Sequence, residues 1–374
     1  MAGDRSARAL ARVSLGAVGD NCRTLHGHLT GGAALCAVVK ADGYGHGAVE
    51  CARVAQAAGA SWLAVAAAGE AARLRAAGIR GPLLTMGPLT RDETAAALAA
   101  DADVVVWEPE YARALAERAA TGPPVRVHVK LDTGMGRLGA LDLDQALAVA
   151  RIAAADPRLA LVGAMTHFAT ADERGDDWFP AQLGRFAAFA EAIRAEHPGT
   201  ILHAANSAAV LREPASHFDM VRCGVAIYGL DPFQGDPAAS GLRPALTLES
   251  VVGAARVFPA GTSAGYGRRW AAERETVVAT LPIGYGDGWR RALTNDCDVL
   301  IGGRRHPLVG AVSMDNVTVD LGPGAAVAPG EPAVLIGTQG GETIRCEEVA
   351  RRIGTINYEV TCGLSARVPR VYEP

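Results

Sequence analysis

The sequence predicts an α/β protein with an N-terminal (β/α)8 barrel of the TIM type, followed by a β-rich C-terminal domain. Short β-branched runs alternate with Ala-rich amphipathic runs over the first two-thirds of the 374 residues. Eight strand runs with helices between them match the count of such a barrel, and several helical runs stop at a glycine. After about Leu242, strand-like runs recur without intervening helices, and the turns are rich in Gly and Pro.

The eight expected barrel strands are runs of four to eight mostly apolar residues. They cover residues 34–40, 62–67, 83–86, 103–107, 125–132, 161–168, 200–205 and 218–224. Helices are expected between them, over 48–60, 69–78, 91–100, 111–120 and 143–155. A doubly wound open sheet is the main competitor, but no G-x-G-x-x-G follows the first strand.

The second domain is expected to contain several short strands and one helix. The strand runs lie at 247–258, 275–283, 297–301, 306–312, 317–322 and 333–337, and the helix at 346–354. We therefore divide the chain into a barrel at 10–242 and a β-rich domain at 243–374, with which residues 1–9 are expected to pack.

Composition argues against several classes of protein. The net charge of −4 and the absence of a basic stripe argue against a nucleic-acid partner. The N-terminus lacks the apolar segment of a signal peptide, and no apolar stretch is long enough to span a bilayer, so we expect a cytoplasmic protein. The seven cysteines contain no C-x-x-C pair, which indicates reduced thiols and no metal site.

Lysine is unusually scarce in this sequence, and its two positions indicate a function. Only two of the 36 lysines and arginines are lysine, namely Lys40 and Lys130. A general drift from lysine to arginine explains the scarcity, but each of the two remaining lysines lies within a motif. Arginine stays protonated, whereas a lysine amine can act as a base or form a covalent adduct. The two lysines therefore indicate amine chemistry.

Polar residues follow the ends of the predicted barrel strands, where the active sites of such barrels lie. Lys40 ends the first strand, where burial would favour a neutral amine able to form a Schiff base with an aldehyde. The other candidates are Tyr44 after the first strand, Lys130 and Arg137 after the fifth, His167 after the sixth, His203, Asn206 and Ser207 after the seventh, and Arg222 and Gly224 after the eighth.

These motifs resemble the alanine racemase family, whose members are fold-type III pyridoxal phosphate (PLP) enzymes. In the barrel the similar segments are VVKADGYGHG, VKLDTGMGRLG, THFATADE, HAANSAAVL and VRCGVAIYGL. In the second domain they are AGYGRRW, LPIGYGDGW, VSMDN and INYEVTCGLSARVPRVY. Nine motifs in the same order and at fitting spacing cover nearly the whole chain.

The resemblance implies a two-base racemase that acts as a homodimer. Lys40 would bind PLP and exchange a proton on one face of the substrate Cα. Tyr266 of the other subunit would work on the opposite face. The product D-alanine would supply peptidoglycan.

The resemblance also implies roles for the residues around these two bases. Arg222, supported by His203, would face the pyridine nitrogen, and Arg137 with the backbone at Met314 would hold the substrate carboxylate. Lys130 would be carbamylated and would orient Arg137. The remaining cofactor-binding positions are Tyr44, His167, Asn206, Ser207, Gly224, Val225 and Tyr358, and those of the entrance are Asp172, Tyr285 and Arg291.

Each assignment has a simpler structural explanation. Tyr44 and the two histidines are also typical of buried core positions, and Asn206 with Ser207 suits a helix cap, which is compatible with binding a phosphate. Arg137 suits a structural role, and the three entrance residues suit a polar surface. Gly265 departs from the family, in which Ser usually precedes the tyrosine, and so does Ser14, where an acidic residue is usual. We expect Gly265 to loosen the loop that carries Tyr266.

Three other functions fit parts of this pattern. A serine or broad-specificity racemase would share both bases, although the missing signal peptide argues against a periplasmic type. A fold-type III decarboxylase should carry a Gly-rich phosphate loop, which we do not find. A non-catalytic PLP-binding protein would lack the second domain.

Overall fold

The computed structural model describes residues 7–119 and 122–374, which form two compact units. The barrel unit comprises Val18–Phe233 and Pro237–Arg243. The β-rich unit comprises the described residues up to Ala17 together with Gln234–Asp236 and Pro244–Pro374.

The barrel unit is a closed ring of eight parallel strands. Each strand pairs with its neighbour in sequence, and the ring closes where the last strand pairs with the first. This closure confirms the predicted barrel over an open sheet. The strands are β2 (Ala34–Val38), β3 (Trp62–Val65), β4 (Leu83–Thr85), β5 (Asp103–Val106), β6 (Val125–Lys130), β7 (Leu159–Met165), β8 (Ile201–His203) and β9 (Met220–Cys223).

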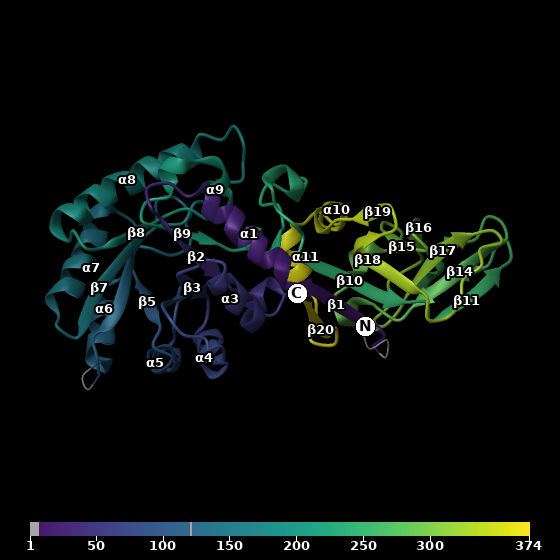
Figure 1. Cartoon of the computed structure of the whole chain (residues 1–374), viewed down its shortest axis with the longest axis horizontal. Coiled ribbons are helices and arrows are strands. Elements are labelled where there is room, and N and C mark those ends of the chain that lie inside the picture. Colours follow the sequence, from purple (N-terminus) through teal and green to yellow (C-terminus); the bar gives the residue numbers. More distant parts are fainter. Residues whose placement is uncertain (1–6, 120–121) are drawn as a thin grey trace. The chain divides into compact units, whose positions relative to one another are not determined.

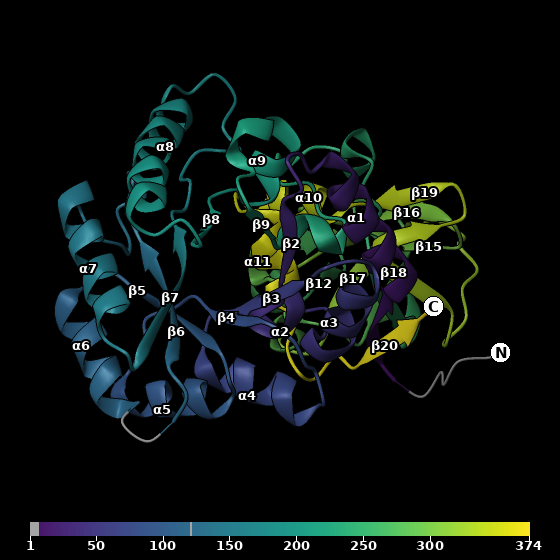
Figure 2. The same ribbon diagram turned by 60° about the vertical axis from the view of Figure 1, so that its left-hand side comes forward.

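Helices cover the outer side of these strands, as Figures 1 and 2 show for α4 to α8. Local sequence explains where they begin. Thr90 and Glu93 form a capping box at α5, and Pro109 occupies the first turn of α6. The predicted helix 111–120 corresponds to α6, and its last residue lies outside the described part of the chain. The helices are α2 (Lys40–Tyr44), α3 (Ala48–Ala57), α4 (Ala68–Ala76), α5 (Arg91–Ala99), α6 (Pro109–Arg118), α7 (Leu143–Ala155), α8 (Trp178–Glu196) and α9 (Ser207–Arg212).

The β-rich unit is built on a ten-stranded sheet in the order β11-β14-β17-β16-β15-β18-β10-β1-β20, with β19 paired to β18. A two-stranded ribbon, β12-β13, lies apart from it. The strands are β1 (Ala9–Ser14), β10 (Leu246–Val251), β11 (Ala254–Phe258), β12 (Ser263–Ala264), β13 (Trp270–Ala271), β14 (Thr276–Leu281), β15 (Asp298–Ile301), β16 (Arg304–Val309), β17 (Val317–Gly322), β18 (Pro332–Gln339), β19 (Glu342–Ile344) and β20 (Arg370–Glu373).

The N-terminal strand belongs to the β-rich unit. Strand β1 pairs antiparallel with β10 and parallel with β20. Residues 10–17, which we expected in the barrel, therefore group with the sheet, because residues 10–14 belong to β1 and pair with β10 and β20, and residues 15–17 follow directly as the start of a helix. Helix α1 (Leu15–His28) follows this strand. The β-rich unit also contains the α-helices α10 (Cys346–Arg352) and α11 (Asn357–Cys362).

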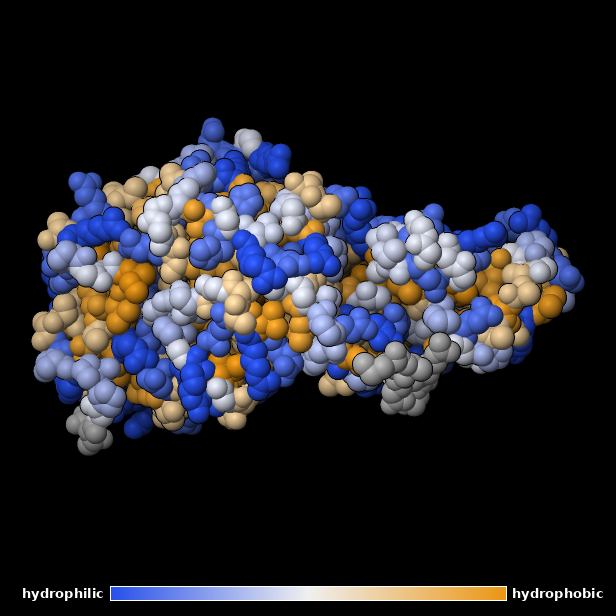
Figure 3. Space-filling model, viewed as in Figure 1, coloured by the Kyte–Doolittle hydropathy of each residue, from blue (hydrophilic) through white to orange (hydrophobic). Residues whose placement is uncertain are grey.

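The surface is mixed in character. On the face drawn in Figure 3, hydrophilic residues extend over both units, with apolar residues scattered between them. Within residues 7–119 and 122–374, no helix has the length and apolar character needed to cross a membrane.

Candidate active site

Lys40 begins a strained turn at the end of the first barrel strand. Ala41, Asp42 and Tyr44 each have φ of 52°, Gly43 has φ of 63° and Gly45 has φ of 82°, so five consecutive residues have positive φ. This conformation costs an L-residue roughly 1–2 kcal/mol. The N–H of Ala48 donates to Asp42 Oδ1 at 3.1 Å and helps to hold the turn. Backbone strain of this kind is found where function requires a fixed geometry.

The turn brings the Tyr44 hydroxyl against the backbone after the last strand. A Cβ on Gly224 would lie 2.2 Å from Tyr44 Oη, so glycine is required for this approach. Ser207 Oγ accepts hydrogen bonds from the N–H groups of Gly224 at 3.1 Å and Ala226 at 3.3 Å. Hydroxyl groups from two strand ends thus meet beside one stretch of backbone, which continues into the buried Val225.

Asn206 supports this arrangement from the start of α9. Its side chain accepts a hydrogen bond from the Ala209 N–H at 3.0 Å. Asn206 is therefore a helix cap. From the sequence we considered this structural role as well as a role in cofactor binding.

Positive charges gather around Lys130. Lys130 is the last residue of β6 and is only 4% exposed. Burial lowers the pKa of Lys130 to about 8, and the positive charges of Arg222, Arg137 and Lys40 act in the same direction. The ammonium form of Lys130 is therefore poorly stabilised by the protein.

His167 lies among the same four cations. Burial first, and then Arg222, Lys130, Arg137 and Lys40, hold the pKa of His167 well below its usual range. Its Nδ1 lies 3.3 Å from Arg222 Nη2. Four cations around a neutral imidazole form a site suited to an anionic ligand.

Arg222 is buried, and both of its terminal nitrogens are occupied. Nη1 donates to His203 Nδ1 at 3.0 Å and to the His203 carbonyl at 2.9 Å. Nη2 donates to the carbonyls of Thr166 at 2.7 Å and Ala204 at 3.1 Å. Among the described residues, only Nε is left without an acceptor. Burial lowers the pKa of Arg222 to about 10, so the guanidinium stays charged near neutral pH.

Asp132, to which we assigned no role from the sequence alone, shapes the loop that carries Arg137. Oδ1 of Asp132 accepts from the N–H groups of Gly134, Met135 and Gly136, and Oδ2 accepts from that of Arg137 at 3.0 Å. These four donors occupy a carboxylate whose negative charge acts on Lys130. The Asp-Thr-Gly sequence after a barrel strand was the available signal, because Asp commonly caps such turns.

The β-rich unit carries the other predicted site residues on its surface loops. Tyr266 is 72% exposed, and Tyr285, Arg291 and Met314 are exposed as well. The N–H of Gly286, next to Tyr285, donates to the Met314 carbonyl at 2.9 Å, so these two loops are neighbours. Tyr358 is half-buried in α11, and Asp172 is exposed in the barrel unit.

Gly265 has a defined conformation before Tyr266. Its φ of 69° and ψ of −178° belong to a region that almost only glycine adopts. A Cβ there would lie 3.0 Å from the backbone nitrogen of Ala311. The glycine thus permits a close approach of two loops, which differs from the loosening effect expected from the sequence.

Two family models cover almost all of the chain. The model of the alanine racemase N-terminal domain matches residues 13–232, and that of the alanine racemase C-terminal domain matches residues 245–372. The chain belongs to the alanine racemase family. It is therefore an isomerase with the barrel and β-rich domains of that family.

Individual relatives agree with this assignment over nearly their full length. The alanine racemase of Symbiobacterium thermophilum is 43% identical over 364 residues, which cover 97% of this chain and 96% of the relative. That of Geobacillus stearothermophilus is 41% identical and covers 97% of this chain and 92% of the relative.

Solved alanine racemase structures share the fold. The enzyme from D-cycloserine-producing Streptomyces lavendulae has a TM-score of 0.93 at 38% identity, with 98% of this chain and 97% of that chain covered. The alanine racemase of E. faecalis has a TM-score of 0.93 at 36% identity, with both chains covered completely.

Proposed function

We propose that the protein interconverts L-alanine and D-alanine with PLP bound covalently to Lys40. The observation that carries this proposal is the position of Lys40, at a barrel strand end among other cations and with its Nζ 6.0 Å from the centre of the Tyr44 ring. The family membership agrees with it, since the relatives are named for this reaction. The D-alanine produced would serve peptidoglycan synthesis.

Residues of the barrel unit are suited to bind both the phosphate and the pyridine nitrogen of PLP. The hydroxyls of Tyr44 and Ser207, with the backbone at Gly224 and Val225, suit the phosphate, and Asn206 holds the helix that begins there. We assign Tyr358 to the same group. Arg222 suits the pyridine nitrogen, because Nε is its remaining donor within the described structure. PLP, when bound, supplies the electron sink that stabilises negative charge at the substrate Cα.

Two bases on opposite faces are required for inversion. We assign Lys40 Nζ to one face of the substrate Cα and the hydroxyl of Tyr266 to the other. One base removes the α-proton and the other delivers a proton to the opposite face, so the configuration changes. We assign His167 to a supporting role, because it is neutral and its Nδ1 lies 3.3 Å from Arg222 Nη2.

Tyr266 is assigned to the site of a second subunit. The Tyr266 side chain is 72% exposed, so most of its surface contacts no other residue of its own chain among those described. Exposed large side chains of this kind are typical of surfaces that another molecule covers. We therefore propose a homodimer in which each active site uses Lys40 from one chain and Tyr266 from the other.

Arg137 and the backbone at Met314 are assigned to the substrate carboxylate. The Arg137 guanidinium has no ion-pair partner within the described residues, and Lys130 next to it is the group we propose to be carbamylated. The lowered pKa of Lys130 favours this reaction, because only the neutral amine attacks CO2. The ammonium first loses one proton to water. The neutral amine then attacks CO2, a C–N bond forms as one C–O π bond opens, and a second proton leaves to water, so an anionic carbamate replaces a cation. Asp172, Tyr285 and Arg291 are assigned to the entrance.

The reaction is tested by exchange of the α-proton in D2O, measured for single amino acids with purified protein and PLP. We expect exchange and racemisation with alanine from both enantiomers. Equal or faster reaction with serine or with many side chains would support a broad-specificity racemase instead. Binding of PLP without any exchange would support a non-catalytic PLP-binding protein.

The shared active site is tested by mixing two inactive variants. Chains with Lys40→Ala and chains with Tyr266→Phe are mixed under conditions in which subunits exchange. Hybrid dimers would contain one intact site, so activity should return. Absence of recovery, with exchange confirmed by mass, would contradict a site built from two subunits.

A further inference from the structure

A chain of buried hydrogen bonds runs through the barrel behind Arg222. His203 Nδ1 accepts from Arg222 Nη1 at 3.0 Å, and His203 Nε2 lies 2.9 Å from His128 Nδ1. His128 Nε2 lies 3.1 Å from Asp103 Oδ2, and Arg126 Nε donates to Asp103 Oδ1 at 2.5 Å. Asp103, His128 and His203 are fully buried. The interior of such a barrel is normally filled by layers of apolar side chains, so a polar chain here needs an explanation.

A glycine makes room for this chain. His128 is on β6 and His203 is on β8, so their hydrogen bond spans the intervening strand β7. Gly163 of β7 lies beneath it, and a Cβ at this position would lie 2.0 Å from His128 Nδ1. Any larger residue at 163 would displace the His128 ring. The backbone is therefore adapted to a contact between two imidazoles.

The two ends of the chain determine the position of every proton in it. An arginine can only donate, and the Asp103 carboxylate, which is paired with Arg126, can only accept. Two neutral imidazoles between them satisfy all three hydrogen bonds in a single arrangement. Each ring must carry its proton on Nε2 and accept on Nδ1. If His128 were a cation, it would donate through both nitrogens, and His203 would have to accept at both of its own, which a neutral imidazole cannot do.

We infer that Asp103 and His128 are positioning residues for Arg222. They hold His203 in the tautomer that accepts from the guanidinium, and this keeps Arg222 in place with Nε unoccupied. In the opposite tautomer, His203 would direct an N–H at Arg222 Nη1, and that contact would be lost. The proton positions follow from the hydrogen bonds alone, whereas their effect on the pyridine nitrogen rests on the function proposed above.

The first test measures the tautomers directly. The full-length protein is labelled with ¹⁵N-histidine, and the ring nitrogens of His128 and His203 are assigned from the signals lost in His128→Phe and His203→Phe. We expect both rings to be neutral, with Nε2 protonated and Nδ1 bare. A cationic ring, or a proton on Nδ1 of either ring, would overturn the inference. This result does not depend on PLP, so it stands even if the proposed cofactor is wrong.

The second test breaks the chain at a distance from the cofactor. His128→Phe keeps an aromatic ring, which is somewhat larger than imidazole, but removes both nitrogens, and Gly163→Ala displaces the ring. Asp101→Asn is the matched control, because Asp101 also pairs with Arg126, at 2.9 Å, but does not touch His128. The measurements are the absorption spectrum of bound PLP, its dissociation constant and the circular dichroism of each variant.

We expect both chain-breaking variants to weaken PLP binding roughly tenfold or more, the usual cost of leaving buried hydrogen-bonding groups unpaired. Their PLP spectrum should shift, while Asp101→Asn should keep the native spectrum and affinity. Folded variants with native spectrum and affinity would overturn the positioning role. If neither variant folds, the tautomer measurement decides. Failure of the unaltered protein to bind PLP would contradict the proposed function but not the tautomers.

Discussion

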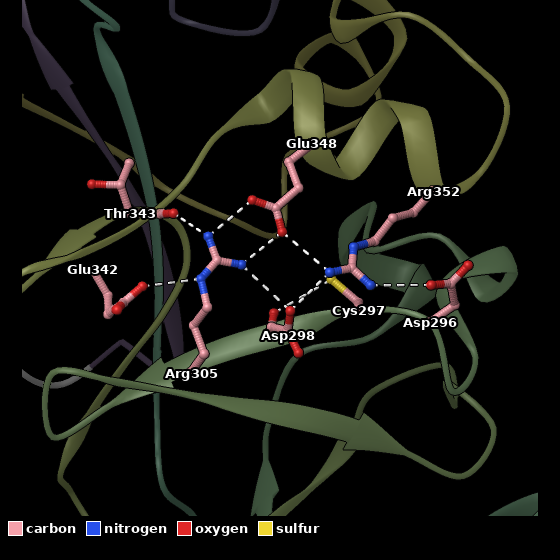
Figure 4. Close-up of polar contacts among 8 residues, drawn as sticks. All are labelled: Asp296, Cys297, Asp298, Arg305, Glu342, Thr343, Glu348 and Arg352. Carbon is pink, nitrogen blue, oxygen red and sulfur yellow. Dashed lines mark hydrogen bonds and ion pairs between the residues drawn. The ribbon is translucent and has the colours of Figure 1, made fainter. Parts of the chain in front are cut away.

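Two groups of basic residues in this molecule have opposite environments. In the β-rich unit, Arg305 and Arg352 lie among carboxylates and a carbonyl (Figure 4). Glu348 binds Arg305 through both oxygens, at 2.7 and 2.9 Å, and also accepts from Arg352 at 3.3 Å. Asp298 accepts from both arginines, at 3.4 and 2.8 Å. The Glu348 carboxylate raises the pKa of Arg305, as expected for a compensated charge.

In the barrel unit, Lys130, Arg137 and Arg222 have no carboxylate within ion-pair distance among the described residues. Burial lowers the pKa of Lys130 to about 8 and that of Arg222 to about 10. The Asp103 carboxylate is linked to Arg222 only through His128 and His203. The Asp132 carboxylate accepts hydrogen bonds from backbone N–H groups instead. Compensated arginines stabilise a fold, whereas uncompensated cations mark a place where an anionic ligand completes the charge balance.

The largest effect is expected from removing the amine of Lys40. Lys40→Arg keeps a positive charge but cannot act as a base or bind PLP covalently. We expect racemisation to fall by more than the roughly 10²–10⁴-fold that a single general base contributes, because Lys40 serves both purposes. Activity is measured by the formation of D-alanine from L-alanine. Retention of more than a trace of activity would show that charge alone suffices at this position.

A smaller and asymmetric effect is expected for Tyr266→Phe. The variant retains Lys40, so it should still exchange the α-proton of one enantiomer, which we expect to be D-alanine. Exchange from the other enantiomer should fall by roughly 10²–10⁴-fold, the contribution of a positioned base. Exchange in D2O is followed separately for each enantiomer. Equal losses for both would contradict the two-base assignment.

Lys130→Ala tests how the barrel balances its charges. Without a carbamate to orient Arg137, KM for alanine should rise about tenfold, the cost of a lost hydrogen bond to a charged group, while PLP still binds. A small carboxylate such as acetate should partly restore activity. Labelling with ¹³CO2 followed by ¹³C NMR should detect the carbamate in the active protein. A bare amine at Lys130 in fully active protein would refute this role.

The same lysine has a consequence for stability against pH. As a bare amine, Lys130 has a folded pKa of about 8, below its ordinary value of 10.5. The cost of burying the ammonium is present in full below pH 8 and disappears as the pH rises to 10.5. Relative to Lys130→Ala, an unmodified protein should thus gain stability over this range. A carbamylated protein should show no such gain.

The smallest effect on activity is expected in the compensated group. Glu348→Gln should leave kcat unchanged and lower the free energy of unfolding by about 1 kcal/mol, since the ion pairs are partly exposed. Arg351→Gln is the control, because Arg351 lies on the same helix, is exposed and forms no ion pair among the described residues. Urea unfolding measures both. A fall in kcat for Glu348→Gln would contradict the separation of the two groups.

This difference should depend on pH with a defined sign. Arg305 holds the pKa of Glu348 below its ordinary value of 4.5. The stabilisation is therefore present above pH 4.5 and lost as the pH falls through the folded pKa. The unaltered protein and Glu348→Gln should converge in stability in acid. A constant difference down to pH 3 would assign the effect to packing.

The sequence predicted the barrel strands well, because a parallel strand that is buried on both faces reads as a short apolar run. All eight expected runs overlap a barrel strand, and seven contain it completely; β7 begins at Leu159, two residues before its expected run. It placed residues 10–17 with the barrel, because a strand gives no local signal of the partner with which it pairs. Position in the sequence was a poor guide there, since β1 pairs with strands that follow residue 245.

Site residues could be predicted from the sequence where the proposed chemistry requires a particular residue type. Lysine scarcity and motif order led to Lys40 and Lys130. Asp103, His128 and Gly163 could not be found, because their importance depends on contacts between strands far apart in the sequence. The left-handed turn after Lys40 was also hidden, since Ala41 and Asp42 give no hint of a positive φ.

Borohydride reduction tests the central claim most directly. The protein is reconstituted with PLP, reduced, digested and mapped by mass spectrometry, so that the residue linked to the cofactor is identified. We predict a pyridoxyl group on Lys40 and none on Lys130, because Lys40 Nζ lies 6.0 Å from the centre of the Tyr44 ring, whose hydroxyl we assign to the phosphate, while Lys130 is buried. A pyridoxyl group on Lys130, or on neither lysine, would contradict the account.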